Sequence, residues 1–121
     1  MSVLTGMRVL IVEDEPLIAM TLEDILIDLG CVVVGLASRL NEALDLVRRL
    51  EVDAAILDVN IHGEKSFPVA SALQQRGARY VFATGYGLQG VGKGFSNVPV
   101  LQKPYSQAQI AAALEALANA R

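Results

Sequence analysis

Residues 7–15 read Met-Arg-Val-Leu-Ile-Val-Glu-Asp-Glu, a run of aliphatic side chains that ends abruptly in three acids. A β-branched and leucine-rich run without polar alternation is typical of a strand buried on both faces of a parallel sheet. Pro16 follows where a first helical turn tolerates proline, and apolar residues then recur at helical spacing up to Leu29, just before Gly30. This stretch therefore predicts a strand, an acidic loop and a helix in succession.

The same alternation continues to the end of the chain. Further strands are expected over residues 31–36, 54–57, 79–83 and 98–102, and helices over about 40–50, 66–76 and 106–117. Ser38 and Ser106 are the expected caps of two of these helices, and Gly77 is the expected end of another. Strands separated by helices pair in parallel through right-handed crossovers. We therefore expect an α/β fold with a flavodoxin-like, doubly wound five-stranded parallel sheet in the order 2-1-3-4-5.

One segment breaks the pattern where the topology requires a fourth helix. Five glycines fall within ten residues, at Gly85, Gly87, Gly90, Gly92 and Gly94. Each glycine inside a helix costs about 1 kcal/mol relative to alanine, which exceeds what the few apolar residues between them can supply. We expect a loop, or a weak or missing fourth helix, over residues 86–97.

The composition of the chain excludes several classes of protein. The chain has 121 residues, of which 53% are hydrophobic, so residues 1–121 are expected to form a single domain. A formal net charge of -3 makes nucleic-acid binding unexpected. The single cysteine, Cys31, excludes an intramolecular disulfide and a cysteine-rich zinc site. No apolar run is long enough for a membrane span, and we expect a cytoplasmic monomer with no membrane partner.

Polar residues follow the predicted strands at the edge where ligands bind in open parallel sheets. Glu13 and Asp14 follow the first strand, Asp58 the third, Thr84 the fourth and Lys103 the fifth. Carboxylates held close together repel one another, and oxygen ligands without histidine or cysteine favour Mg²⁺. With Mg²⁺ bound, one carboxylate can attack a phosphoryl group while the hydroxyl and the ammonium hold the oxygens that carry its charge.

These motifs resemble the receiver domain of two-component response regulators over essentially the whole chain. The matching stretches are Val-Leu-Ile-Val-Glu-Asp-Glu (9–15), Ala-Ile-Leu-Asp-Val-Asn-Ile (55–61), Phe-Ala-Thr-Gly-Tyr (82–86) and Leu-Gln-Lys-Pro-Tyr (101–105). The resemblance implies that Asp58 is the phosphoacceptor and that Thr84 and Lys103 hold the phosphoryl group. It implies a Mg²⁺ site formed by Asp14, Asp58 and the backbone carbonyl of Asn60, with Glu13 orienting a metal-bound water. A cis peptide before Pro104 would aim Lys103 inward.

The resemblance also implies a function. A sensor histidine kinase would donate a phosphoryl group to Asp58, and a downstream protein target or phosphotransfer protein would recognise the altered surface. The chain would then be a switch that assists its own phosphorylation and dephosphorylation, not an enzyme for an external substrate. Residues 82–85, Phe-Ala-Thr-Gly, are similar to the subgroup of stand-alone receivers named for a Phe-Ala-Thr-Gly-hydrophobe-Tyr motif and typically paired with HWE-type sensor kinases.

Two positions depart from these patterns. Gly87 occupies the last place of the subgroup motif, and Val100 occupies the place where typical receivers carry an aromatic ring that follows the threonine. Because the Val100 side chain is stiff and has no ring to swing, we expect the switch to order part of residues 86–97 instead. Asn60 and Tyr86 are expected to influence the lifetime of the phosphoryl group. For Tyr105 two roles stay open, core packing or part of the surface that a partner recognises.

Two other classes of function fit these residues less well. A small phosphohydrolase of the haloacid-dehalogenase type would need an Asp-x-Asp motif after the first strand, where residues 14–16 read Asp-Glu-Pro. A binding module that works without phosphorylation is disfavoured by the intact acceptor and lysine positions. The glycine-rich segment matches G-x-G-x-x-G and part of a P-loop, but it follows the fourth strand and lacks the helix that both sites require. The single histidine, His62, is expected to be an exposed loop residue.

Overall fold

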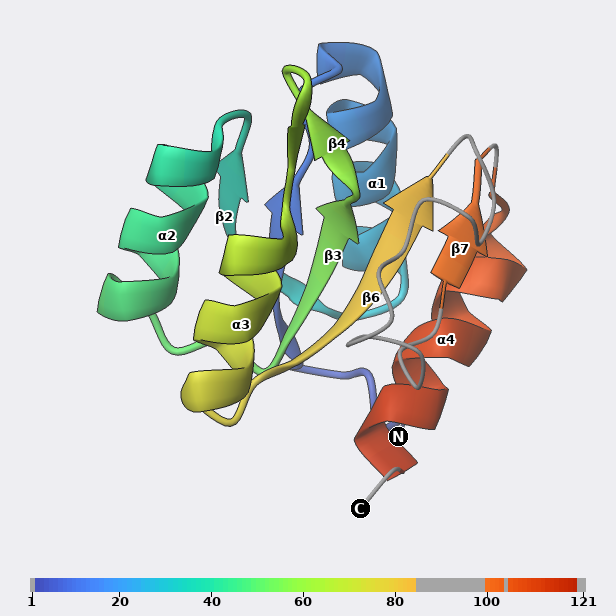
Figure 1. Ribbon diagram of the computed structural model, residues 1–121. Coiled ribbons are helices and arrows are strands. Elements are labelled where there is room, and N and C mark those ends of the chain that lie inside the picture. Colours follow the sequence, from blue (N-terminus) through green and yellow to red (C-terminus); the bar gives the residue numbers. More distant parts are fainter. Residues whose placement is uncertain (1, 85–99, 104, 120–121) are drawn as a thin grey trace.

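A parallel sheet forms the centre of the computed structural model, which describes residues 2–84, 100–103 and 105–119 (Figure 1). Its strands are β1 (Arg8–Val12), β2 (Val32–Ala37), β3 (Ala54–Asp58), β6 (Arg79–Thr84) and β7 (Val100–Gln102). Their order is β2-β1-β3-β6-β7, which is the predicted flavodoxin-like order 2-1-3-4-5 when only the strands of this sheet are counted. The predicted loop over residues 86–97, with its weak or missing helix, and Pro104 lie outside the described residues.

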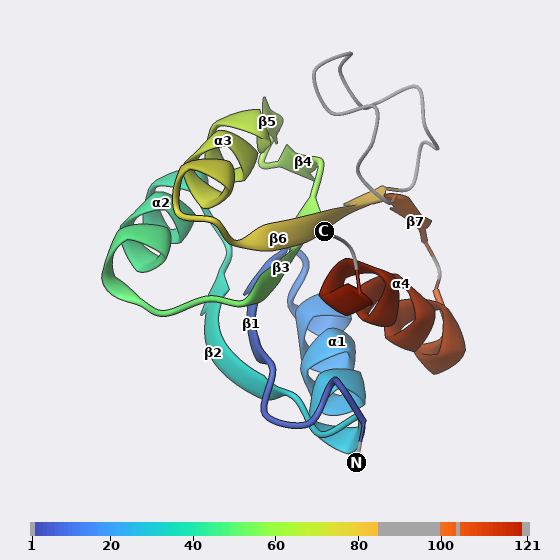
Figure 2. The same cartoon turned by 90° about the horizontal axis from the view of Figure 1, so that it is seen from below.

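Helices cover both faces of the sheet (Figure 2). On one face lie α1 (Pro16–Asp28) and α4 (Gln107–Asn119), and on the other lie α2 (Leu40–Arg49) and α3 (Phe67–Gln75). Because side chains alternate along a strand, Val9 and Ile11 of β1 belong to the core under α1 and α4, and Leu10 and Val12 to the core under α2 and α3. None of the helices in the described part of the chain has the length and apolar character needed to cross a membrane.

The helix ends follow the glycine signals of the sequence. Gly30 and Gly77 have φ values of +92° and +76°, a left-handed conformation that favours glycine. At the end of α3, the N–H of Ala78 donates to the Leu73 carbonyl at 3.0 Å, and the N–H of Gly77 donates to the Gln74 carbonyl at 3.1 Å. These two bonds form a Schellman motif, so the predicted ends of both helices are confirmed.

The two predicted caps differ in outcome. Ser106 Oγ accepts the N–H of Gln109 at 3.2 Å, and Gln109 Oε1 accepts the N–H of Ser106 at 2.7 Å, which is a reciprocal capping box. Ser38 does not cap α2, because Arg39 is the N-cap residue, although the helix begins at Leu40 as predicted. The Glu42 carboxylate instead accepts the N–H of Ser38 at 3.2 Å and its hydroxyl at 3.3 Å.

A small antiparallel hairpin follows β3 where the sequence predicts only a polar loop. It joins β4 (Asn60–Ile61) to β5 (Glu64–Lys65). The two turn residues, His62 and Gly63, have φ values of +49° and +81°, the pattern of a tight two-residue hairpin turn. His62 is exposed, as expected. This hairpin lies at the edge of the sheet that carries the acidic residues (Figure 1).

We predict that Gly77→Ala lowers the free energy of unfolding by about 1 kcal/mol, because an L side chain strains the left-handed backbone. A Cβ added at Gly77 meets nothing within 4 Å, so the cost isolates the backbone conformation. Gly77→Asn is the matched control and should cost less, since asparagine tolerates this conformation. Urea denaturation measures both, and equal stability of Gly77→Ala and the native chain would contradict the prediction.

Candidate functional site

Strand alternation brings three charged side chains to one corner of the sheet. Glu13 continues the row of Val9 and Ile11 beyond β1, and Asp58 continues the row of Ala54 and Ile56 at the end of β3. Lys103 continues the row of Leu101 just after β7. All three rows belong to the face that α1 and α4 cover. The parallel strands end at the same edge, so these side chains meet although they are far apart in sequence.

The Lys103 ammonium lies between two buried carboxylates. Its Nζ is 2.8 Å from Glu13 Oε1 and 2.9 Å from Asp58 Oδ2. Glu13 is only 2% exposed and Asp58 only 7% exposed, so these acids have lost most of their contact with water. A carboxylate buried in this way needs a cation and hydrogen-bond donors to remain ionised. The bridging lysine supplies the charge for both.

Backbone N–H groups donate one further hydrogen bond to each of the three acids. Glu13 Oε2 accepts the N–H of Glu15 at 3.1 Å, and Asp58 Oδ1 accepts the N–H of Asn60 at 3.2 Å. Asp14 Oδ2 accepts the N–H of His62 at 2.9 Å. The last bond ties the loop after β1 to the tip of the hairpin. Sequence reasoning missed it because it depends on the hairpin turn, and the signal that could have found it is His62-Gly63 flanked by short extended segments.

Burial and neighbouring charges set the ionisation of this cluster. Burial raises the pKa of Glu13 to about 7, with Asp58 adding to the rise and the Lys103 ammonium and the Glu15 N–H opposing it. Burial acts to lower the pKa of Lys103, but Asp58 and Glu13 outweigh it, so its pKa lies above the ordinary value. Burial acts to raise the pKa of Asp14, but the His62 N–H and other hydrogen bonds outweigh it, so its pKa is lowered.

The donor set fits a hard divalent cation. Glu13, Asp14 and Asp58 each offer a carboxylate oxygen, and these atoms lie within 4.8 Å of one another. Asn60 lies two residues beyond Asp58, and its Oδ1 is buried without a hydrogen-bond partner among the described residues. An all-oxygen set with an excess of negative charge is suited to Mg²⁺. The structure therefore brings together the carboxylates of the predicted metal site, with Asn60 adjoining them.

Thr84 approaches the same corner from the neighbouring strand. It ends β6, is buried, and its carbonyl accepts the N–H of Lys103 at 2.9 Å. By alternation it continues the row of Tyr80 and Phe82, which faces α2 and α3. Val100, the position without an aromatic ring, pairs in register with Phe82. The Phe82 ring in turn makes edge contacts with Tyr80 and Phe67, at centroid distances of 5.5 and 5.7 Å.

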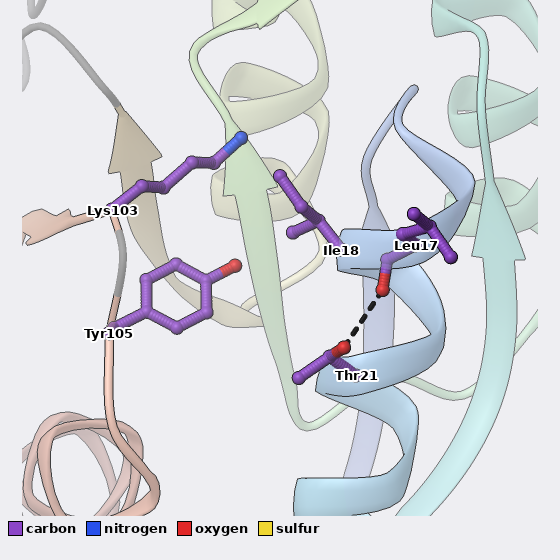
Figure 3. Close-up of a pocket in the computed structure, with 5 residues that line it drawn as sticks. All are labelled: Leu17, Ile18, Thr21, Lys103 and Tyr105. Carbon is purple, nitrogen blue, oxygen red and sulfur yellow. Dashed lines mark hydrogen bonds between the residues drawn. The ribbon is translucent and has the colours of Figure 1, made fainter.

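A pocket of about 420 Å³ opens beside Lys103 (Figure 3). It is lined by Leu17, Ile18, Thr21, Lys103 and Tyr105. The helix α1 forms one wall, and the chain after β7 forms the other. Leu17 is 79% exposed at its rim. The pocket gives the Lys103 side chain, which is 16% exposed, a partly apolar surrounding on the α1 side.

Comparisons with known proteins agree with this geometry. The sequence-family model of the response regulator receiver domain matches residues 9–115 of this chain. SdrG from Sphingomonas melonis Fr1 is 52% identical with a TM-score of 0.84, over 97% of this chain and 98% of SdrG. The BeF3-activated conformation of SdrG from Pseudomonas melonis Fr1 is 49% identical with a TM-score of 0.82, over 94% of this chain and 98% of that chain.

Two longer relatives match over part of their length. The response regulator PhyR from Brucella abortus is 26% identical with a TM-score of 0.79, over 93% of this chain and 49% of that chain. The nitrate/nitrite response regulator NarP of Escherichia coli (strain K12) is 35% identical over 74 residues, which are 60% of this chain and 34% of NarP. The match thus spans about a third of NarP and about half of PhyR.

We predict that the metal-free protein loses stability as the pH rises from 4.5 to about 7. The pKa of Glu13 is raised from 4.5 to about 7 on folding, so in this window the folded state holds a proton that the unfolded state has released. The contribution is fully present below pH 4.5 and is lost as the pH passes the folded pKa, by at most about 3 kcal/mol. Urea denaturation in EDTA across this range measures the slope.

Glu13→Gln should flatten this pH dependence. Glu51→Gln, at a side chain that is 79% exposed, is the matched control and should leave the slope in place. A slope of unchanged size in Glu13→Gln would show that another group causes it.

Proposed function

The chain belongs to the response regulator receiver domain family, and we propose that it acts as a phosphorylation-dependent switch with Asp58 as the phosphoacceptor. The observation that carries this proposal is the Lys103 ammonium, shared between Asp58 Oδ2 and Glu13 Oε1 at 2.9 and 2.8 Å. It holds positive charge next to the carboxylate that would receive a phosphoryl group. A buried acceptor with an adjacent cation and an oxygen-donor cluster suits phosphoryl transfer.

The proposed metal is Mg²⁺, which receiver domains bind through acidic residues. Asp14, Asp58 and the backbone carbonyl of Asn60 would hold it, and Glu13 would orient one of its water molecules. When bound, the ion would neutralise charge on the phosphoryl oxygens. The hydrogen bond from the His62 N–H to Asp14 Oδ2 at 2.9 Å supports this assignment, because it holds the carboxylate beside Asp58 and Glu13.

The transfer step follows from the position of Asp58. A carboxylate oxygen of Asp58 would form a bond to phosphorus, while the bond between phosphorus and the imidazole nitrogen of a phosphohistidine breaks. The imidazole keeps the electron pair and takes up a proton from solvent. The Asn60 N–H, which donates to Asp58 Oδ1 at 3.2 Å, orients the carboxylate. Lys103 would then pair with a phosphoryl oxygen, and the Thr84 hydroxyl would bond to another.

We extend the proposal to the binding partners and the cellular location of the protein. A sensor histidine kinase would donate the phosphoryl group, and the Phe-Ala-Thr-Gly stretch suggests the HWE type. A downstream protein target or phosphotransfer protein would recognise the phosphorylated surface. The cytoplasm, a monomeric state and the lack of nucleic-acid and membrane partners belong to the same proposal. A net charge of -3 supports the exclusion of nucleic acid.

We predict that acetyl phosphate with Mg²⁺ adds one phosphoryl group per chain and that Asp58→Asn abolishes the addition. Asparagine keeps the shape of the side chain but lacks the nucleophilic oxygen. Intact-protein mass spectrometry measures the adduct. Asp53→Asn is the matched control: Asp53 is paired with Arg8 at 2.9 Å at the opposite edge of the sheet, so its loss should not affect labelling.

Three outcomes separate the classes of function. A stoichiometric adduct supports the switch, many turnovers of acetyl phosphate per chain would indicate a phosphohydrolase, and no adduct would indicate a binding module. Asp14→Asn should raise the Mg²⁺ concentration needed for labelling without removing the acceptor. A full adduct on Asp58→Asn would show that the acceptor is another residue.

A further inference from the structure

The hydroxyl of Tyr105 is a buried polar group to which the proposed function gives no task. Its oxygen has no hydrogen-bond partner among the described residues. The ring packs against the core under α1 and α4, which is the face that also carries Glu13, Asp58 and Lys103. Figure 3 shows the Tyr105 hydroxyl and the Lys103 ammonium pointing in the same direction, from the β7 side toward α1. Leaving a buried hydroxyl unpaired costs free energy, so a partner in another state of the protein would explain it.

The Glu13 carboxylate has few hydrogen-bond donors around it. Its Oε2 accepts the Glu15 N–H, but among the described residues the close partner of Oε1 is the Lys103 ammonium at 2.8 Å. The same ammonium also holds Asp58 Oδ2. When Asp58 carries a phosphoryl group, additional negative charge competes for this one cation. The Lys103 ammonium then interacts less strongly with Glu13 Oε1, which remains buried. A buried carboxylate without a close cation is costly in free energy.

Tyr105 is placed to make up this loss. Thr21 lines the same pocket, but its hydroxyl donates to the Leu17 carbonyl at 2.9 Å. Ser66 also has a buried hydroxyl without a partner among the described residues, but it precedes α3, on the other face of the sheet. Burial, and next the charge of Glu13, raises the pKa of Tyr105. The hydroxyl therefore keeps its proton and lies within the electrostatic reach of Glu13.

We propose that Tyr105 is a positioning residue for the phosphorylated state: its hydroxyl donates a hydrogen bond to the Glu13 carboxylate once the Lys103 ammonium turns toward the phosphoryl oxygens. This inference rests on the proposed function of Asp58. In the resting state the hydroxyl makes no stabilising hydrogen bond with the described residues. In the phosphorylated state it keeps Glu13 in place, so that Lys103 can serve the phosphoryl group.

The test compares Tyr105→Phe with the native chain, using Mg²⁺ and the phosphoryl mimic beryllofluoride. The substitution keeps the ring and removes only the hydroxyl oxygen. We expect the melting temperature of the metal-free protein to stay unchanged or rise, and the affinity for Mg²⁺ alone to stay unchanged. The affinity for beryllofluoride at saturating Mg²⁺ should fall about tenfold, the size of a hydrogen bond to a charged group.

Tyr80→Phe is the matched control. Its hydroxyl oxygen is 2.6 Å from Gln74 Nε2 on the other face of the sheet. Removing it should lower the melting temperature while leaving the beryllofluoride affinity unchanged. A purely structural role of Tyr105 would produce the same result as this control.

A double-mutant cycle identifies the partner of the hydroxyl. If Tyr105 acts through Glu13, adding Tyr105→Phe to Glu13→Gln should cost clearly less than the tenfold loss in the native background. Equal losses in both backgrounds, an unchanged beryllofluoride affinity of Tyr105→Phe, or a matching loss of Mg²⁺ affinity would each overturn the inference. If the native chain itself fails to bind beryllofluoride, the proposed function fails, which is a separate result.

Discussion

The Lys103 ammonium between Glu13 and Asp58 is the interaction on which the rest of the site depends. The topology forces carboxylates from two neighbouring strands together, and burial makes their mutual repulsion costly. One cation shared at 2.8 and 2.9 Å balances both. The N–H groups of Glu15, Asn60 and His62 then fix one oxygen each of Glu13, Asp58 and Asp14. Three acids thus share a single ammonium, which leaves negative charge in the cluster available for a metal ion.

Much of the fold follows from local patterns in the sequence. The aliphatic runs locate the strands because a doubly covered parallel sheet buries both faces of its central strands. Gly30 and Gly77 mark helix ends because the backbone there is left-handed. The cap of α2 was not predictable in this way, because Ser38 donates to the Glu42 carboxylate instead of accepting an N–H of the helix, and Arg39 is the N-cap residue. The hairpin at His62 was missed because two-residue strands have no periodicity.

The site was predictable to the level of which side chains meet, and no further. Parallel strands end at one edge, so the order of Glu13, Asp58 and Lys103 along the chain is sufficient to expect a cluster. The choice of Glu13 and Asp58 as the two partners of Lys103 depends on side-chain rotamers and distances of a few tenths of an ångström. The same limit applies to the Tyr105 hydroxyl, because a tyrosine in a core pattern reveals its ring but not the direction of its oxygen.

Strand alternation also decides which faces of the sheet the proposed phosphorylation of Asp58 would affect. Glu13, Asp58 and Lys103 continue rows that face α1 and α4. Thr84 continues the row of Tyr80 and Phe82, which faces α2 and α3 and contacts the Phe67 ring. A phosphoryl group at this edge would draw on Lys103 from one face and on Thr84 from the other. A phosphoryl group there would therefore act on both helical layers. On the α2 and α3 side, the aromatic rings are those of Phe82 and its neighbours, because Val100, which pairs with Phe82 and packs against the same core, has no ring.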